Sequence, residues 1–396
     1  MKKKILFMIK SMNVGGTEKA LLNMIAEMPK DKFDITILML EKTGGFLNLI
    51  PSGIRVDYLK KFENIRGAIN DPPHLTAWKL FKEGKVTRAF TIAALHLVSK
   101  VTNDRSCFFR YLLKGYPVLE EKYDIAIAYA GPMEFISFFV VDKIRAKKRI
   151  QWIHFDITKI GFNKRFASKL YEKFDNIVVV SKEGKDKLID LLPNFKDKTD
   201  ILHNIVSPEL IKLRAKQGKG FTDNFNGLRI LTVGRLSFEK GQDIAIKVLC
   251  KLIKNGYNVR WYCVGEGSLR GEYENLIVKY NLQDKFILMG VDPNPYTYID
   301  ECDIYVQPSR YEGYCITVAE ARCLNKPIVT TDVNGTKEQI QNNVNGLIVG
   351  INADDIYEGI VELIKNKDLR NKFSENLSQQ KLSSKEEIKK ITKIII

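Results

Sequence analysis

The chain has 396 residues, of which 45% are hydrophobic and 28% are charged, and its formal net charge at pH 7 is +16. This apolar fraction is enough to fill complete cores, so global disorder is excluded, and the length fits two domains with room for a third. Six cysteines without a Cys-x-x-Cys pair, and only four histidines, argue against a zinc framework or a disulfide scaffold and favour a reduced, cytoplasmic setting.

The first residues resemble the basic start of a secretory signal peptide. Met1-Lys2-Lys3-Lys4 is followed by an apolar run that already ends at Lys10, which is too short for the core of such a peptide. No stretch approaches the roughly 18 apolar residues of a membrane-spanning helix. We therefore expect a protein that is soluble or lies on a surface.

Short apolar strands alternate with amphipathic helices along most of the chain, a pattern typical of βα units around a parallel sheet. In the first half the expected strands are Lys4–Ile9, Phe33–Leu40, Arg55–Leu59, Asp124–Tyr129, Arg149–Ile153 and Asn176–Ser181. The expected helices there are Thr17–Met28, Met133–Ile144, Lys164–Phe174 and Lys182–Leu191.

The same alternation continues in the second half. The expected strands are Leu228–Val233, Val259–Val264, Lys285–Met289, Ile304–Gln307 and Pro327–Thr330. The expected helices are Gly241–Asn255, Ser268–Tyr280, Ile316–Leu324, Ala353–Asn366 and Lys385–Ile395. The two halves together predict two doubly wound α/β domains.

A break in the periodicity near Asn204–Lys219 separates the two domains, because Ser207-Pro208 and Gln217-Gly218-Lys219-Gly220 are typical of a linker. We place the N-terminal domain at residues 1–205, the C-terminal domain at 206–380 and a last helical segment at 381–396. Residues 60–122 interrupt the alternation of strands and helices, so we expect a helical insertion in the first domain.

The positive charge is concentrated in the first half. Residues 1–205 carry a net charge of +13 and residues 206–396 only +3, while residues 60–115 alone carry +7. This segment also contains the aromatic residues Phe81, Phe90, Phe108, Phe109 and Tyr111. A solvated basic face and a nucleic-acid surface are alternatives, but we find no nucleic-acid-binding motif and expect no nucleic-acid partner. We favour a pair of interfacial helices that faces an anionic membrane surface.

In sheets of this kind ligands bind beyond the carboxyl ends of the strands, so we expect the ligand-binding residues directly after each strand. After the first strand, Gly15-Gly16-Thr17-Glu18 opens a helix. Two glycines allow the backbone to approach a ligand closely, and the start of a helix offers free N–H groups to an anion. A tight turn without a ligand is the alternative, and the Gly-x-Gly-x-x-Gly dinucleotide fingerprint is absent.

A histidine follows the strand that ends at Ile153. His154 would face the expected cleft, which makes it a candidate catalytic residue rather than only a structural one. Asp156 either orients His154 or faces solvent.

Two cations follow the strand Leu228–Val233. Arg235 and Lys240 lie in the turn Gly234-Arg235-Leu236-Ser237-Phe238-Glu239-Lys240-Gly241, where they can converge on one anionic ligand. Arginine binds phosphate bidentately and lysine acts as a point charge. A surface charge pair is the alternative. Another turn with glycines, at Gly265, is weak evidence by itself.

The most specific pattern is Pro308-Ser309-Arg310-Tyr311-Glu312-Gly313-Tyr314-Cys315 followed by a helix that contains Glu320. Glu312 lies in the loop and Glu320 about one and a half turns inside the helix. Gly313 lets backbone N–H groups turn towards an anion, and carboxylates accept hydrogen bonds from sugar hydroxyls. Two solvated glutamates are the alternative, which the apolar neighbours Val318, Ala319 and Ala321 weaken.

These motifs together resemble the retaining GT-B glycosyltransferases of glycosyltransferase family 4. The resemblance rests on the two glutamates with seven intervening residues after Pro308-Ser309, and the turns at Gly15, Arg235 and His154 agree with it. Val329-Thr330-Thr331-Asp332 with Gly335, and Asn345-Gly346-Leu347, also resemble segments of the family. The resemblance covers nearly all of residues 220–365, and residues 60–122 have no counterpart. It implies a GT-B fold, in which two Rossmann-like domains face each other across a cleft and the last helix crosses back to the first domain.

The resemblance also implies four catalytic residues. Arg235 and Lys240 would hold the diphosphate of a nucleotide sugar, and His154 would contact the donor sugar near the reacting centre. Glu312 would meet the donor sugar and the phosphates.

The remaining implied residues bind the donor. Glu320 would bind the ribose hydroxyls, and the base would lie near Val291 and Gly265. Backbone atoms that meet the sugar and phosphates would come from Gly15, Gly16, Gly313, Tyr314 and Cys315.

Arg235 and Lys240 can replace a metal, and no Asp-x-Asp pair is present, so we expect transfer without a metal or other cofactor. The resemblance implies retention of anomeric configuration, and the first domain offers no clear nucleophilic carboxylate. We therefore expect the leaving phosphate to take the proton of an acceptor that attacks from the same face.

The expected substrates are a nucleotide sugar, with UDP as the nucleotide and a hexose or N-acetylhexosamine as the sugar, and a lipid-linked or oligosaccharide acceptor. The expected pathway is assembly of bacterial capsule, exopolysaccharide or O-antigen by a cytoplasmic enzyme on the inner face of the membrane. The alternatives are a nucleotide-sugar epimerase and a non-catalytic nucleotide-sugar-binding partner of an active transferase.

Overall fold

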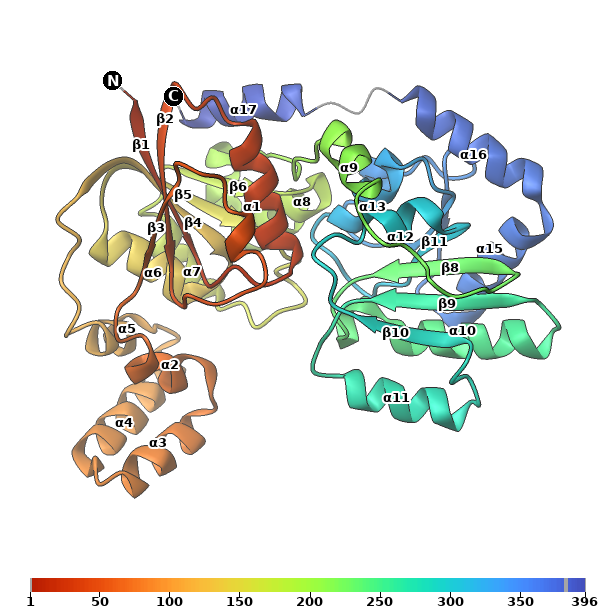
Figure 1. The fold of residues 1–396 in the computed structure, drawn as a ribbon. Helices are drawn as coiled ribbons and strands as arrows, with labels where there is room; N and C mark the ends of the chain where they lie inside the picture. The colour runs from red at the N-terminus through yellow and green to blue at the C-terminus, as the bar shows by residue number, and fades with distance from the viewer. Residues whose placement is uncertain (1, 381–383, 396) are drawn as a thin grey trace.

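The computed structural model describes residues 2–380 and 384–395, which fold into two parallel β-sheets with helices on both faces (Figure 1). The first sheet has seven strands in the order β3-β2-β1-β4-β5-β6-β7, and the second has six in the order β10-β9-β8-β11-β12-β13. All ladders between these strands are parallel. The prediction of two doubly wound α/β folds is confirmed.

In the first sheet every predicted strand is present. The strands are β1 (Lys3–Ile9), β2 (Phe33–Met39), β3 (Arg55–Tyr58), β4 (Lys122–Gly131), β5 (Arg145–Ile153), β6 (Asn176–Val179) and β7 (Thr199–Ile201). The predicted helices are α1 (Gly16–Glu27), α6 (Glu134–Lys143), α7 (Lys164–Tyr171) and α8 (Lys182–Leu191). The edge strand β7 escaped prediction because three residues, two of them polar, carry no periodic signal.

The second sheet is formed by β8 (Leu228–Val233), β9 (Val259–Val264), β10 (Phe286–Gly290), β11 (Ile304–Gln307), β12 (Ile328–Thr331) and β13 (Leu347–Val349). Its predicted helices are α10 (Gln242–Lys254), α11 (Arg270–Lys279), α13 (Ile316–Cys323) and α15 (Ala353–Lys365). The unpredicted ones are α9 (Pro208–Ala215), α12 (Tyr296–Glu301), α14 (Thr336–Gln339) and α16 (Lys367–Gln379). Helix α16 buries only Phe373 and Leu377, so its apolar pattern is faint.

Each sheet has a hydrophobic core on both faces. In β1, Ile5, Phe7 and Ile9 point into one core, whereas Leu6 and Met8 point into the other. A strand that is covered on both faces reads as a continuous apolar run, which is why these strands are visible in the sequence.

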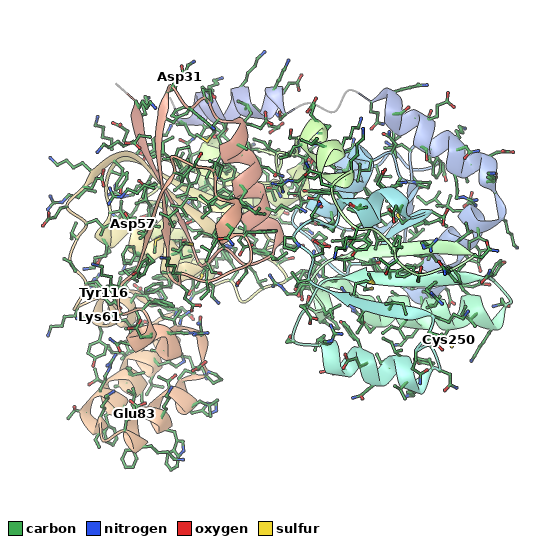
Figure 2. The ribbon with its side chains drawn as sticks, in the orientation of Figure 1. Asp31, Asp57, Lys61, Glu83, Tyr116 and Cys250 are labelled. Carbon is green, nitrogen blue, oxygen red and sulfur yellow. The ribbon has the colours of Figure 1, made fainter. Side chains whose placement is uncertain are left out.

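The basic segment forms a helical lobe that projects from the first domain (Figure 1). The helical lobe comprises α2 (Glu63–Asn70), α3 (Pro73–Lys82), α4 (Val86–Thr102) and α5 (Ser106–Leu112). At its base the hydroxyl of Tyr116 donates to the carbonyl of Lys61 at 2.8 Å, and Figure 2 labels both residues.

Only part of the predicted aromatic surface is exposed. Phe108 and Phe109 are 1% exposed and pack into the core of the first domain. The expectation that these two residues lie on the surface is therefore wrong. Phe81 and Phe90 are 51% and 70% exposed, and the unpredicted Trp78 is 59% exposed. No helix in residues 2–380 or 384–395 is long and apolar enough to cross a membrane.

The last helix, α17 (Lys385–Ile395), follows the second domain but packs on the first (Figure 1). Ile391 and Ile395 join the core that contains Ile5 and Phe7, and the ammonium of Lys148 donates to the carbonyl of Ile394 at 2.6 Å. Residues 381–383 and 396 of the predicted last segment lie outside the described residues.

A histidine in the connection between the domains links three segments. Nε2 of His203 lies 2.7 Å from Oε2 of Glu338 in α14, and its backbone N–H donates to Oε2 of Glu387 in α17 at 3.0 Å. The imidazole stacks on Tyr314, and Lys390 also bonds to Glu387. The hydrogen bond to Glu338, assisted by Glu387, raises the pKa of His203 to about 9. The imidazole is therefore protonated at neutral pH and bridges two carboxylates.

Because of this link, we expect the stability of the folded protein to fall as the pH becomes alkaline. A raised pKa means that the folded state binds more protons than the unfolded state between pH 6.5 and about 9. The stabilisation is full below pH 6.5 and is lost as pH rises through about 9, so the melting temperature should fall across that interval. In His203→Gln the fall should be smaller. Melting curves of both proteins at several pH values measure it, and parallel curves would show that the link contributes nothing.

Candidate functional site

The loops at the carboxyl ends of the two sheets touch across the domains. A Cβ added to Gly313 would overlap the carbonyl oxygen of His154 and lie 2.7 Å from its carbonyl carbon. A Cβ added to Gly16 would lie 3.5 Å from Cγ2 of Ile316. The structure thus brings together the turns at Gly16, His154 and Gly313, which are far apart in the sequence.

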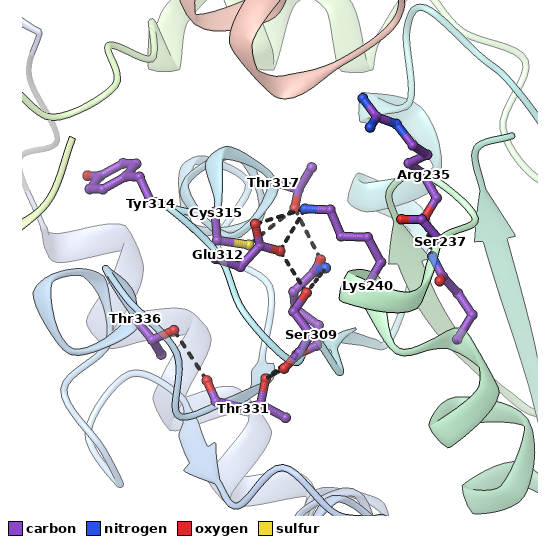
Figure 3. A network of polar contacts seen from close by, with 12 residues as sticks. Arg235, Ser237, Lys240, Ser309, Glu312, Tyr314, Cys315, Thr317, Thr331 and Thr336 are labelled. Carbon is purple, nitrogen blue, oxygen red and sulfur yellow. Dashed lines mark hydrogen bonds and ion pairs between the residues drawn. The ribbon is translucent and has the colours of Figure 1, made fainter. Parts of the chain in front are cut away.

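A buried polar cluster surrounds Glu312 (Figure 3). Lys240, in a short 3-10 helix at Phe238–Lys240, donates to both carboxylate oxygens of Glu312 at 2.7 and 2.8 Å. The hydroxyl of Ser309 donates to Oε1 of Glu312 at 2.6 Å. Burial disfavours the charged form of Lys240, but the Glu312 carboxylate outweighs this effect and raises the pKa of Lys240. Lys240 is therefore a fixed positive charge at the start of α13.

Arg235 lies on the same turn but points elsewhere (Figure 3). Its guanidinium reaches towards the glycine turn of the first domain, 3.7 Å from a Cβ added to Gly15. Within the described part of the chain its side chain forms no hydrogen bond or ion pair. The two predicted cations border the same loops, one paired with Glu312 and one available for an anion.

Glu320 is completely buried in α13, and it meets the first domain. Its Oε1 lies 2.7 Å from the ammonium of Lys19 in α1, and the hydroxyl of Tyr296 donates to the same oxygen at 3.2 Å. Oε2 has no hydrogen-bond partner among the described residues. Lys19 could not be predicted from sequence, because nothing local pairs it with a carboxylate 301 positions away.

His154 is buried between aromatic rings at the end of β5. Its ring centroid lies 4.5 Å from that of Tyr129 and 6.0 Å from that of Trp152. Burial lowers the pKa of His154 to about 3, so the imidazole is neutral. Both ring nitrogens are buried and form no side-chain hydrogen bond among the described residues, and the backbone of Tyr129 opposes the lowering of the pKa.

Both expectations for Asp156 are wrong. Asp156 is 3% exposed, and its carboxylate binds the hydroxyl of Thr158 at 2.6 Å and the ammonium of Lys187 at 2.8 Å. Lys187 also donates to Asn334 of the second domain. Asp156 therefore supports a contact between the domains and does not orient His154.

The region predicted to hold a base is framed by backbone. The N–H of Gly265 donates to the carbonyl of Gly290 at 2.7 Å, and Val291 beside it is 45% exposed. Cys315, immediately before α13, has a left-handed backbone with φ of 57°, and the carbonyl of Tyr314 accepts from the amide of Gln339. The predicted donor-binding residues thus lie on loops at the carboxyl ends of strands, except Gly16, which begins α1, and Glu320, which lies within α13.

Glu18 is a second residue that sequence reasoning underestimated. It was noted only as part of the turn that opens α1, but burial raises the pKa of Glu18 to about 7, against a backbone hydrogen bond and the charges of Arg235 and Lys10. No group of three or more His, Cys, Asp or Glu residues in positions 2–380 and 384–395 is arranged to hold a metal ion.

The sequence is similar to those of known glycosyltransferases. Residues 217–380 match the family model described as Glycosyl transferases group 1. The chain is 31% identical over 216 residues to the N-acetylgalactosamine-N,N'-diacetylbacillosaminyl-diphospho-undecaprenol 4-alpha-N-acetylgalactosaminyltransferase of Campylobacter jejuni, covering 53% of this chain and 56% of that protein. It is 25% identical over 342 residues to an uncharacterized glycosyltransferase of Methanocaldococcus jannaschii, covering 73% and 84%. In several curated matches the chain spans about half of the relative's length.

Solved structures share the fold. Anabaena HepE in complex with UDP and glucose has a TM-score of 0.71 at 18% identity, with 99% of both chains covered. S. aureus TarM, in a complex that contains UDP, has a TM-score of 0.71 at 16% identity and the same coverage. These likenesses confirm the predicted GT-B fold.

Proposed function

We propose, because residues 217–380 match the family model of the glycosyl transferases group 1, that the protein is a hexosyltransferase that uses a nucleotide sugar. The observation that carries the proposal is the cluster of Lys240, Ser309 and Glu312 at the start of α13, with Arg235 beside it and the first domain against it. HepE and TarM hold UDP in complexes with the same fold, which supports UDP as the donor nucleotide.

Departure of the diphosphate is the step that needs this cluster. When the bond between sugar and phosphate breaks, negative charge develops on the leaving phosphate, and preorganised cations stabilise it most effectively. Lys240 is already held in place by Glu312, and the side chain of Arg235, although its charge acts on the nearby Glu18, forms no hydrogen bond or ion pair among the described residues. Both can therefore neutralise the leaving group, which supports transfer without a metal.

The sugar would lie between the two domains. His154 presents a neutral imidazole there, suited to a hydrogen bond with a sugar hydroxyl. We propose that the acceptor attacks from the face that the phosphate leaves, so that configuration is retained and the phosphate takes the proton. Contact between Gly313 and His154 would exclude water, the competing acceptor.

The acceptor is proposed to be a lipid-linked glycan of a bacterial surface polysaccharide, made at the inner face of the membrane. The Campylobacter relative is named for a diphospho-undecaprenol-linked acceptor, and another relative is an amylovoran biosynthesis glycosyltransferase of Erwinia amylovora.

An assay of UDP release from UDP-sugars, with and without lipid-linked acceptors and in the presence of a chelator, tests the proposed function. Acceptor-dependent release that survives chelation supports it. Epimerised donor without release, or binding without turnover, would favour an epimerase or a non-catalytic partner.

We propose that the helical lobe meets the membrane. Its exposed apolar side chains are Leu75, Trp78, Phe81, Val86, Phe90, Leu97, Val98 and Val101. Exposed lysines stand among them, and the ammonium of Lys82 lies 5.3 Å from the centre of the Trp78 ring. Aromatic and apolar residues mixed with lysines fit the interface of an anionic bilayer.

Charge reversal in the lobe should weaken binding to phosphatidylglycerol vesicles. Each lysine near an anionic surface contributes about 1 kcal/mol, so the triple variant Lys79→Glu/Lys82→Glu/Lys100→Glu should bind about 100-fold or more weakly. The matched control reverses three exposed lysines of the second domain, Lys247, Lys254 and Lys279. Vesicle sedimentation measures the binding of both variants. Equal binding by the two would show that the lobe is a solvated basic face and does not bind the membrane.

A further inference from the structure

An ion pair crosses from the first domain into the donor domain at Glu320. Lys19 in α1 and Glu320 in α13 are separated by 2.7 Å, and their side chains are 12% and 0% exposed. The ammonium also lies 4.4 Å from the centre of the Tyr296 ring, whose hydroxyl donates to the same carboxylate oxygen. Two groups, one from each domain, therefore meet at Oε1 of Glu320.

The pair is incomplete as a structural element. Burying two charges costs desolvation free energy, which attraction repays only if the remaining hydrogen-bonding positions are also satisfied. Here Oε2 of Glu320 is buried and has no partner among the described residues. A buried acceptor without a partner costs about 1 to 3 kcal/mol. A ligand hydroxyl that donates to Oε2 would remove this cost.

We propose that Lys19 is a positioning residue for nucleotide recognition: it holds Oε1 of Glu320 and leaves Oε2 as a directed acceptor for a ribose hydroxyl. The inference rests on the proposed function, in which Glu320 binds the ribose. Its consequence is that the first domain takes part in reading the nucleotide. Because Glu320 has its counter-charge only when α1 packs against α13, ribose binding and contact between the domains favour each other.

A purely structural ion pair makes a different prediction. If Lys19 only joins the domains, its loss weakens UDP and 2′-deoxy-UDP binding by the same factor. If Lys19 positions Glu320, its loss selectively weakens the ligand that has the 2′-hydroxyl.

The experiment measures dissociation constants of UDP and 2′-deoxy-UDP by calorimetry. We expect the wild type to prefer UDP by about 10-fold, the worth of one hydrogen bond to a charged group. Lys19→Met should lose most of this preference, and Lys19→Arg, which keeps the charge, should retain it. Lys19→Met/Glu320→Gln should bind UDP better than Lys19→Met, because no uncompensated charge remains.

The control is Lys30→Met, which removes an exposed charge from the same domain and should change neither constant. Circular dichroism melts check that each variant is folded. If Lys19→Met is not folded, the comparison of Lys19→Arg with the wild type provides the test. A folded Lys19→Met that keeps the full preference, a Lys19→Arg that loses it, or a wild type that binds both ligands equally would overturn the inference. A wild type that binds no nucleoside diphosphate at all would instead overturn the proposed function.

Discussion

Replacing Lys240 with alanine is expected to lower kcat by about 100- to 1000-fold, the loss typical when one preorganised group that stabilises developing negative charge is removed. The ammonium of Lys240 is held at 2.7 Å by Glu312 before any ligand binds, so the wild type spends little free energy in reorganising it. The variant loses this charge and leaves the Glu312 carboxylate nearly buried without its cation.

Steady-state kinetics of UDP release separates the two effects. A change mainly in kcat, with a smaller change in the donor KM, indicates stabilisation of the leaving group. The control Lys254→Ala removes an exposed lysine of α10 and should leave both constants unchanged. A kcat for Lys240→Ala within a few-fold of the wild type would remove Lys240 from the mechanism.

The second large effect is expected from a single methyl group at Gly313. In Gly313→Ala the new Cβ would overlap the carbonyl oxygen of His154, which is backbone and cannot rotate away. The two domains would have to separate locally by about 1 Å, and a misplacement of that size can cost about 100-fold in rate. We expect kcat/KM to fall by about that factor while each domain remains folded.

The matched control is Gly271→Ala in α11, where an added Cβ meets nothing within 4 Å. This variant should keep full activity and gain slightly in stability, because alanine is the better helix former. Parallel assays and melting curves of the two variants measure the outcome. Wild-type activity in Gly313→Ala would show that contact between the domains at this point is not needed for transfer.

Periodicity predicted the fold well where strands are covered on both faces. Runs such as Ile5–Ile9 and Ile304–Gln307 are nearly free of polar residues, so their place in a parallel sheet was readable. Elements that fill gaps at the edges were not, because β7 and β13 have three residues each and α16 buries only two side chains. The pattern marked residues 60–122 as different but could not separate buried Phe108 from exposed Trp78.

The candidate site was predictable as a set of loops but not as a set of contacts. The rule that ligands bind beyond the carboxyl ends of strands brought Gly16, His154, Lys240 and Glu312 into consideration from different parts of the chain. Which side chains pair is decided by tertiary packing, so Lys19 at Glu320 was missed and Asp156 was assigned to the wrong neighbour. Likewise, the total net charge of +16 does not indicate a function by itself. Its distribution along the chain does, because most of the excess positive charge lies in the first domain.

The central claim is that Lys240 and its neighbours hold the diphosphate of a nucleotide sugar. Thermal shift of the wild type and of Lys240→Ala with saturating UDP-glucose, UDP-N-acetylglucosamine and UDP tests it most directly, because a ligand that binds only the folded state raises the melting temperature. The account predicts a rise of several degrees for the wild type with UDP or a UDP-sugar, and a much smaller rise for Lys240→Ala with UDP, on which the negative charge of the leaving group has fully developed. No rise for the wild type with any of these or with GDP- or ADP-sugars, or equal rises for both proteins with UDP, would contradict it.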